Sequence, residues 1–408
     1  MPGAGSCPMF PSDSVWHADA SALPVHPNSD TYVASIGVSN HVHADFGSGT
    51  WDGGPIGIPY DVVGAGQPTT SVTFDYDDES DHVPYPIPAD ASIEGGSDST
   101  GDRHVIVLDN SSCTIYELYA AYPNGDGTWH AGSGAVWNLN SNALRPDTWT
   151  SADAAGLPIL PGLVRYDEVA SGHVDHAIRV TVPRSDRSYL WPARHQAGSA
   201  NASLPPMGLR LRLKQDVDLS SFPPDDQVIL QAMKTYGVIV ADNGSPWFIS
   251  GVPDERWNND DLSRLGAIHG SDFDAVDESG LTVNADSGQA AASGAPPAPP
   301  SPSAPPSPPR GANPAQSTTP TTGGAIPNGS PTSSVPASAS DPAPSSTAAP
   351  VTSTSTPSST ELAAREPNVT VRARDDASHG AWPWMAAALV VILGCGAVGY
   401  RLRRRLAS

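Results

Sequence analysis

Residues 104–122 read HVIVLDNSSCTIYELYAAY and contain two runs of β-branched, aromatic and other apolar residues. The runs cover residues 104–109 and 113–122, and the polar turn at 110–112 separates them. Two such runs joined by a short polar turn are typical of a β-hairpin. We therefore predict that this stretch forms a pair of antiparallel strands.

Similar short runs recur on both sides of the hairpin, with turn residues between them. They cover residues 71–76, 134–139, 176–182, 208–213 and 236–241. Helical patterns are few: one spans 225–236 and ends before a glycine, and one short turn is expected at 151–156. Many strands with few helices predict a mainly β fold, an antiparallel β-sandwich-like domain with decorated loops over residues 7–282.

The C-terminal third has a different composition. Residues 283–380 are rich in Pro, Ser and Thr, which cannot bury a core, so we predict a disordered stalk. Residues 381–400 carry no charge from Trp384 onward and are long enough to cross a bilayer as one helix. Four arginines lie in the tail, residues 401–408, which we therefore place in the cytoplasm. The lipid bilayer is thus an expected partner of this end of the chain.

This orientation places the N-terminal domain outside the cell. Residues 1–10 lack the apolar segment of a secretion signal, so we expect a truncated signal or, less favoured, another export route. The rival arrangement, a cytosolic domain with a tail anchor, conflicts with the arginine tail. The net charge of -22, without a basic patch, argues against nucleic acid as a partner.

Three cysteines are present, and Cys395 lies within the expected membrane helix. Cys7 and Cys113 are the two that remain. On the oxidising side of a membrane such a pair forms a disulfide, which we predict here.

Several stretches of the folded part, namely Asp45-Phe-Gly-Ser-Gly, Gly54-Pro-Ile-Gly-Ile-Pro-Tyr, Thr150-Ser-Ala-Asp-Ala-Ala-Gly-Leu-Pro-Ile and Ala241-Asp-Asn-Gly, resemble a family of uncharacterised exported bacterial proteins. The resemblance covers most of residues 7–278. It implies an exported folded domain, and it supplies no activity and no site residues.

Two stretches have the composition of metal sites. His41, His43 and Asp45 alternate along a short run, so on a strand they face one way, as metal ligands do. The acidic run at 75–82 has the carboxylates that calcium prefers, although such a run is more often a solvated loop. We expect no catalytic cofactor and leave a structural calcium or zinc open.

The segment from 117 to 195 combines carboxylates with tryptophans, as carbohydrate-active sites do. Glycoside hydrolysis needs two carboxylates, one of them with a raised pKa. Our candidate catalytic residues are Glu117, Asp153, Glu168 and His195. Our candidate substrate-binding residues are Trp137, Trp191 and Arg194.

The sequence therefore predicts a glycoside hydrolase that acts on a polysaccharide or cell-wall glycan at the cell surface. Two alternatives stay open: a non-catalytic glycan-binding or adhesion module, and a polysaccharide lyase that uses the Arg194-His195 pair. A third reading makes the tryptophans core residues and the acids turn residues. The turn Asp242-Asn-Gly is assigned only a structural role at this stage.

Overall fold

The computed structural model describes residues 4–292, which form a mainly β domain with few helices, as predicted. No helix within this range combines the length and apolar character needed to cross a bilayer. The predicted membrane helix (381–400), the tail (401–408) and all but the first residues of the predicted stalk lie outside the described residues.

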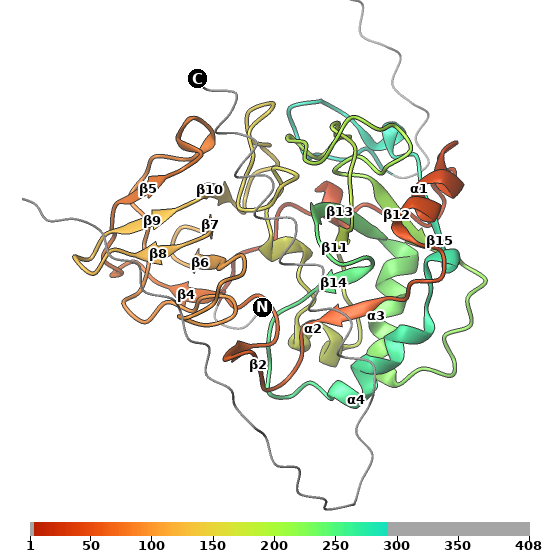
Figure 1. Ribbon diagram of the computed structural model, residues 1–408, viewed down its shortest axis with the longest axis horizontal. Helices are drawn as coiled ribbons and strands as arrows, with labels where there is room; N and C mark the ends of the chain where they lie inside the picture. Colours follow the sequence, from red (N-terminus) through yellow and green to blue (C-terminus); the bar gives the residue numbers. More distant parts are fainter. Residues whose placement is uncertain (1–3, 293–408) are drawn as a thin grey trace, which may run out of the picture. The chain divides into compact units, whose positions relative to one another are not determined.

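The predicted hairpin is the centre of a four-stranded sheet, ordered β10-β7-β6-β4 (Figure 1). Its strands are β4 (Asp61–Val63), β6 (Val105–Asp109), β7 (Thr114–Tyr119) and β10 (Ser133–Asn138). Both faces of β6 are buried: Ile106 and Leu108 point to the larger hydrophobic core, and Val105 and Val107 point to a smaller one. This explains why β6 reads as a continuous apolar run.

The smaller core is closed by a three-stranded sheet, ordered β5-β9-β8, and one short hairpin lies apart from it. The strands of the sheet are β5 (Val72–Phe74), β8 (Tyr122–Pro123) and β9 (Trp129–Ala131). The separate hairpin consists of β2 (Thr50–Trp51) and β3 (Gly54–Pro55). The two sheets therefore share the smaller core, and each contains a parallel pair, β4–β6 and β5–β9, which the antiparallel prediction did not include.

The other half is built on a six-stranded sheet, ordered β1-β14-β11-β13-β12-β15. Its strands are β1 (His43–Asp45), β11 (Ile178–Val182), β12 (Arg210–Leu213), β13 (Val238–Asn243), β14 (Phe248–Ser250) and β15 (Phe273–Ala275). The prediction of antiparallel pairing is only partly right, because β1 pairs with β14, and β11 with β13, in parallel. Parallel pairs need long crossover connections, which local turn residues do not reveal.

The helices belong mainly to the half with the six-stranded sheet (Figure 1). They are α1 (Ser29–Ile36), α2 (Tyr166–Ser171), α3 (Pro224–Thr235) and α4 (Asn259–Leu262). Shorter 3-10 helices cover Val15–His17, Asp77–Glu79, Leu160–Gly162, Ser263–Ala267, Gly270–Asp272 and Ser279–Leu281. The predicted helix at 225–236 corresponds to α3, which begins with Pro224 and two acids and stops before Gly237, where φ is 74°.

The helical turn predicted at 151–156 is absent, and these residues form an irregular loop with a turn at its end. Its backbone groups are used in tertiary hydrogen bonds instead: the amide of Ala155 donates to Ala241, and its carbonyl accepts from Arg194 and His195. Ser151 also bonds the loop internally, since its hydroxyl donates to the carbonyl of Leu157. A helix would have to give up these contacts.

The folded domain extends past the predicted boundary at residue 282. Ser287 bridges to Ala143, and Gln289 bridges to Ser14. Between them, Gly288 donates to Asn142 and accepts from Val15. These backbone bonds tie the segment to the core, which its polar and small side chains do not predict.

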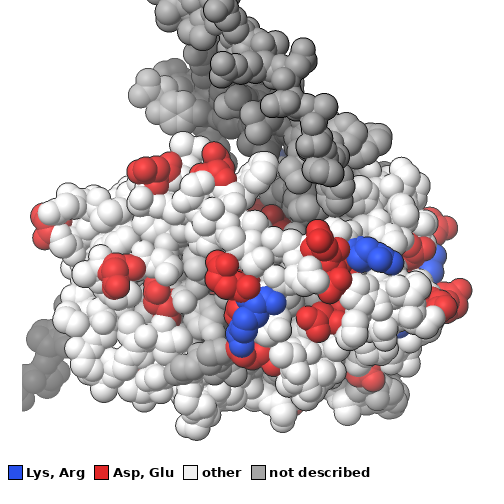
Figure 2. Space-filling view, turned by 90° about the horizontal axis from the view of Figure 1, so that it is seen from below, with Lys and Arg blue, Asp and Glu red and all other residues white. Residues whose placement is uncertain are grey.

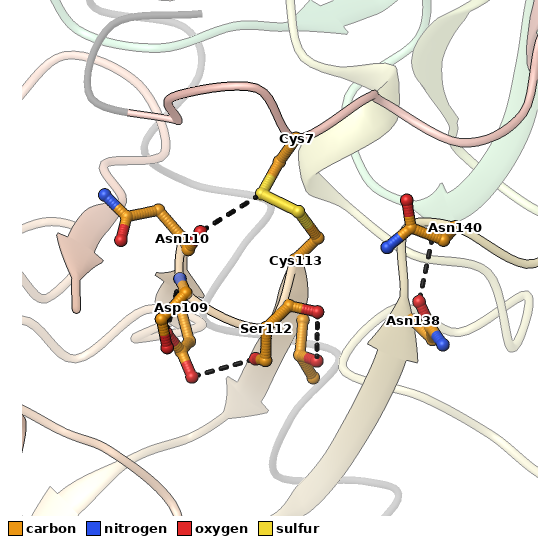
Figure 3. The surroundings of a disulfide bond; sticks show 9 residues. Cys7, Asp109, Asn110, Ser112, Cys113, Asn138 and Asn140 are labelled. Carbon is orange, nitrogen blue, oxygen red and sulfur yellow. Dashed lines mark hydrogen bonds between the residues drawn. A yellow bond between two sulfur atoms is a disulfide. The ribbon is translucent and has the colours of Figure 1, made fainter. Parts of the chain in front are cut away.

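A disulfide joins Cys7 to Cys113, whose Cα atoms lie 5.2 Å apart (Figure 3). It links the N-terminal segment to the turn between β6 and β7. Asp109 holds the same turn by accepting hydrogen bonds from Ser111 and Ser112. The two cysteines therefore fasten the start of the chain to the central hairpin.

Asp226, in the first turn of α3, is a source of instability at neutral pH. Its side chain is fully buried, and neither of its oxygens has a hydrogen-bond partner among the described residues. Burial raises its pKa to about 7, and Asp261 and Asp225 add to this effect while Arg264 opposes it. Because the folded state holds the proton more tightly than the unfolded state, this residue makes the fold less stable as the pH rises from about 4 to 7.

We expect Asp226→Asn to raise the free energy of unfolding by about 1–3 kcal/mol at pH 8 and by much less at pH 4.5. The asparagine stays neutral at both pH values, so the penalty of the buried charge disappears. Urea unfolding of both proteins at the two pH values measures the difference. Equal stabilities at pH 8 would show that the Asp226 carboxylate is solvated in the folded protein.

Candidate functional site

A row of polar side chains crosses one face of the six-stranded sheet. Asp45 on β1 is paired in register with Ser250 on β14. Ser250 lies beside Arg179 on β11, whose Nη1 donates to the Ser250 hydroxyl at 2.7 Å. Cross-strand neighbours share a face of the sheet, so the three side chains project to the same side.

Asp242 joins this row because β13 contains a bulge. Val180 is paired with Val240, whereas Thr181 is paired with Asp242, so Ala241 is an additional residue on β13. A bulge changes the direction in which the next side chain projects and is frequent beside active sites. Here it turns Asp242 to the face that carries Arg179 and Thr181.

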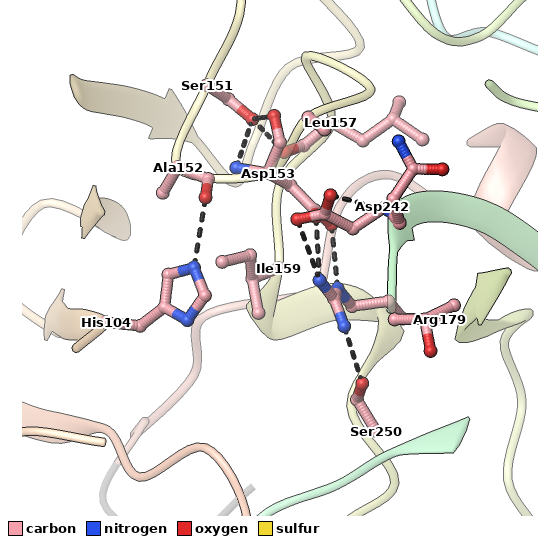
Figure 4. A network of polar contacts seen from close by, with 12 residues as sticks. His104, Ser151, Ala152, Asp153, Leu157, Ile159, Arg179, Asp242 and Ser250 are labelled. Carbon is pink, nitrogen blue, oxygen red and sulfur yellow. Dashed lines mark hydrogen bonds and ion pairs between the residues drawn. The ribbon is translucent and has the colours of Figure 1, made fainter. Parts of the chain in front are cut away.

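Arg179 is the buried centre of this network (Figure 4). Its Nε and Nη2 donate to the two oxygens of Asp153, both at 2.8 Å, which is the bidentate geometry that guanidinium and carboxylate favour. Nη2 also lies 3.5 Å from Oδ2 of Asp242. The Asp153 side chain is fully buried, and Arg179 forms two hydrogen bonds with it. The guanidinium therefore neutralises the charge of Asp153 and offsets that of Asp242 only in part.

The environment of Asp242 favours its protonated form. Burial raises its pKa to about 8, and the negative charge of Asp153 adds to this effect while Arg179 opposes it. The side chain is still 24% exposed, so the proton can reach a bound molecule. A raised pKa together with contact with solvent is what a proton donor requires.

Glu94 and His104 form a second ion pair. Nδ1 of His104 lies 2.6 Å from Oε2 of Glu94, and Nε2 lies 3.0 Å from the carbonyl oxygen of Ala152. Both ring nitrogens face acceptors, so both carry hydrogen. Burial opposes this charge, but Glu94 outweighs it and raises the pKa of His104 to about 9. The pairing in turn lowers the pKa of Glu94 despite its own burial.

Asp45 and Asp102 complete the group, which we call the acidic site: Asp45, Glu94, Asp102 and Asp242. Both side chains are exposed. The pKa of Asp45 is nevertheless raised to about 6, mainly by burial. The charge of Glu94 also raises it, and Arg179 lowers it. The charge of Asp102 contributes to the raised pKa values of both Asp45 and Asp242.

A loop that follows Asp45 connects the two halves of the domain next to this site. It contains the β2–β3 hairpin, where the backbone of Gly54 touches that of Gly95. A Cβ atom at Gly54 would lie 2.1 Å from the carbonyl carbon of Gly95. Only glycine permits this approach, which brings the loop against the turn that carries Glu94.

Glu117, the first catalytic candidate from the sequence, lies outside this site. It is fully buried on β7, and its carboxylate accepts hydrogen bonds from the backbone amides of Ile159 and Leu160 at 2.8–3.1 Å. These amides begin the 3-10 helix Leu160–Gly162. Burial raises the pKa of Glu117 to about 7, while the two amides oppose it. Its oxygens stabilise the loop that carries Asp153 and do not face solvent.

The other catalytic candidates are divided between three places. Asp153 is brought to the acidic site, as the buried partner of Arg179. Glu168 pairs with Arg165 and with His176, where Nε2 and Oε2 are 3.2 Å apart. Burial raises the pKa of Glu168, but Arg165 and the contacts with His176 outweigh it and lower the pKa to about 2. His195 donates from Nδ1 to the carbonyl oxygen of Ala154 at 2.9 Å, and its Nε2 lies 3.9 Å from Oε2 of Glu79.

The three substrate-binding candidates have structural contacts. Trp137 is 4% exposed and belongs to the larger core. Trp191 packs against the same core and donates from Nε1 to the carbonyl of Ser287 at 2.8 Å. Arg194 is buried and donates to two carbonyls and to Asp286. Neither tryptophan presents a free ring, and the guanidinium of Arg194 is already neutralised.

The expected metal ligands do not converge. The ring of His43 stacks on Phe248 with centroids 4.2 Å apart, and His41 lies edge-on to His269. Within residues 4–292 no three His, Cys, Asp or Glu side chains form a group with the geometry of a metal site.

Sequence reasoning missed Asp242, Glu94, Asp102, His104 and Arg179 as members of one site. A signal was available for Arg179, because a charged residue inside the run HAIRVTV must find a buried partner. Asp242 had a weaker one: it ends the apolar run VIVA, where a buried strand reaches the surface. The bulge that directs it leaves no trace in the residue pattern.

Comparison with protein-family models, with curated proteins and with solved structures found no match to this chain.

Proposed function

We propose that the domain is a glycoside hydrolase that uses Asp242 as its proton donor and Asp102 as its second carboxyl group. The observation that carries the proposal is the environment of Asp242. A bulge places it beside the Arg179–Asp153 ion pair, where burial raises its pKa while its side chain stays in contact with solvent. Hydrolysis of a glycosidic bond requires a carboxylic acid that donates a proton and a second carboxyl group nearby.

In this proposal the Asp242 carboxyl donates its proton to the glycosidic oxygen as the bond to the anomeric carbon breaks. Asp102 accepts a proton from the water that attacks this carbon. Asp45 and Glu94 accept hydrogen bonds from sugar hydroxyls, and the Glu94–His104 pair keeps Glu94 ionised. The proton gained by Asp102 passes to solvent, and Asp242 is reprotonated before the next turnover.

A lyase reaction fits the site less well. It requires a cation that neutralises the carboxylate of a uronate. Arg194 is fully occupied by its own partners, and Arg179 and His104 are buried and paired. Figure 2 shows one face of the domain, on which acidic side chains are scattered and the few basic ones lie beside them. The acidic site therefore supports an uncharged substrate.

The test is product analysis on a panel of neutral polysaccharides and polyuronates. A hydrolase releases reducing ends without new ultraviolet absorbance, whereas a lyase produces a conjugated double bond that absorbs near ~235 nm. We expect reducing ends from at least one neutral polymer. Binding to such a polymer without any product would support the glycan-binding module instead.

We also propose that this domain is displayed on the cell surface, held through a stalk by the apolar segment 381–400. The disulfide between Cys7 and Cys113 supports an oxidising location. Protease treatment of intact cells should release the domain. Complete protection, while other surface proteins are removed, would contradict this orientation.

A further inference from the structure

Tyr122 presents an open aromatic face at the edge of the three-stranded sheet. It lies on the edge strand β8, and the residue is 46% exposed. Arg103 covers the ring from one side, with its Cζ atom 4.2 Å from the ring centroid. Arg103 is only 3% exposed, so it lies on the protein side of the ring. The outer face of Tyr122 is therefore free.

The ring is held rigidly in this orientation. The Arg103 guanidinium donates to the carbonyl oxygens of Ala121, Ser97 and Ser99 at 2.8–3.1 Å. A guanidinium fixed by three carbonyls is a firm support for an aromatic ring stacked on it. A rigid aromatic ring loses little conformational entropy when a ligand stacks on it, which distinguishes it from a mobile surface side chain.

The backbone connects this ring to the acidic site. The amide of Ala120 donates to the carbonyl of Asp102 at 2.8 Å, and the amide of Ala121 donates to Arg103. Tyr119, at the end of β7, precedes these residues, and its ring centroid lies 5.9 Å from that of His104. Burial raises the pKa of Tyr119 to about 12, and the charges of Asp102 and Asp242 add to this effect, followed by Tyr76 and Tyr122.

We propose that Tyr122 is the stacking platform of a sugar subsite beside Asp102, and that this subsite takes an uncharged pyranose ring of a polysaccharide. The proposal deepens the hydrolase assignment and rests on it for the identity of the ligand. Pyranose rings have apolar faces that pack on aromatic rings. The exposed charges next to Tyr122 include Asp102, whereas the cation beneath the ring is buried and engaged. A uronate would meet like charge here, and a neutral sugar would not.

The experiment measures binding rather than turnover, on the full-length protein carrying Asp242→Asn. The probes are a soluble β-glucan, a galactomannan and polygalacturonate, each tested by affinity electrophoresis. We expect retardation by at least one neutral polymer and none by polygalacturonate. Adding Tyr122→Ala should weaken the affinity roughly tenfold through loss of stacking, whereas Tyr122→Phe should keep it. Val38→Ala, a change at a residue that is 49% exposed in another part of the domain, is the control.

The outcomes separate this inference from the proposed function. Equal affinity of the Tyr122→Ala and parent proteins overturns the subsite, as does retardation by polygalacturonate alone or by no polymer. If Tyr122→Ala weakens binding while wild-type protein releases no product, the subsite stands and the hydrolase assignment fails. If wild-type protein cleaves a polymer that the Tyr122→Ala variant binds as tightly as the parent does, the hydrolase assignment stands and the subsite is overturned.

Discussion

Replacement of Asp242 by asparagine is expected to lower kcat on a cleaved polysaccharide by about 10²–10⁴-fold, because the amide cannot donate the proton that the leaving sugar needs. The fold should remain intact, since asparagine has nearly the shape of the protonated aspartic acid. The free energy of unfolding at neutral pH should therefore be unchanged or higher. Asp98→Asn, in the exposed loop before Asp102, is the matched control and should retain full activity.

The pH dependence of kcat/KM and of stability should also reveal the Asp242 proton. Asp242 carries its proton below its folded-state pKa of about 8, so kcat/KM should fall as the pH rises through that value. The same raised pKa means that the folded state gains stability from the bound proton, and this gain is lost between about pH 4 and 8. Asp242→Asn should remove both dependences. Wild-type-like activity in this variant would exclude Asp242 as the acid.

Replacement of Arg179 by methionine is expected to lower the free energy of unfolding by about 3–5 kcal/mol. The change leaves Asp153, whose side chain is fully buried, without its ion-pair partner, and Ser250 loses a hydrogen bond. Urea unfolding at pH 7 measures the effect. The variant should also lose activity, because Asp242 would then face an uncompensated charge.

Arg256→Met is the matched control for this prediction. Arg256 also pairs with two carboxylates, those of Asp254 and Asp167, but its side chain is 50% exposed. Exposed ion pairs contribute about 0–1 kcal/mol, so this variant should be nearly as stable as the parent. Similar losses for the two variants would show that Arg179 is no more buried in solution than Arg256.

The strands could be predicted from sequence because each carries its own local pattern. The run at 104–122 forms the β6–β7 hairpin, and the acids and the glycine around 225–237 mark the ends of α3. The pairing of distant strands could not be predicted in this way. The parallel β11–β13 pair depends on a long connection through α3, and the order of the six-stranded sheet depends on packing in the core.

The residues of the candidate site could likewise be predicted only where a local pattern marks them. Asp153 was singled out as an acid on a loop, and the structure places it in the site, although as a buried ion-pair partner. Glu117 had the strand context that a rigid catalytic acid needs, but burial depends on neighbours far away in the sequence. Asp242 looked like part of a turn, because Asp-Asn-Gly has the composition of one. Its position beside Arg179 results from the single additional residue in β13.

The most direct test of the account is an NMR titration of the Asp242 carboxyl carbon, which requires no knowledge of the substrate. Protein labelled with ¹³C at aspartate is titrated between pH 4 and 9, and the resonance is assigned by its loss in Asp242→Asn. The account predicts a midpoint near 8, with Asp242 protonated at neutral pH. A midpoint near 4, the ordinary value for aspartate, would contradict it, because an Asp242 that is ionised at neutral pH has no proton to donate.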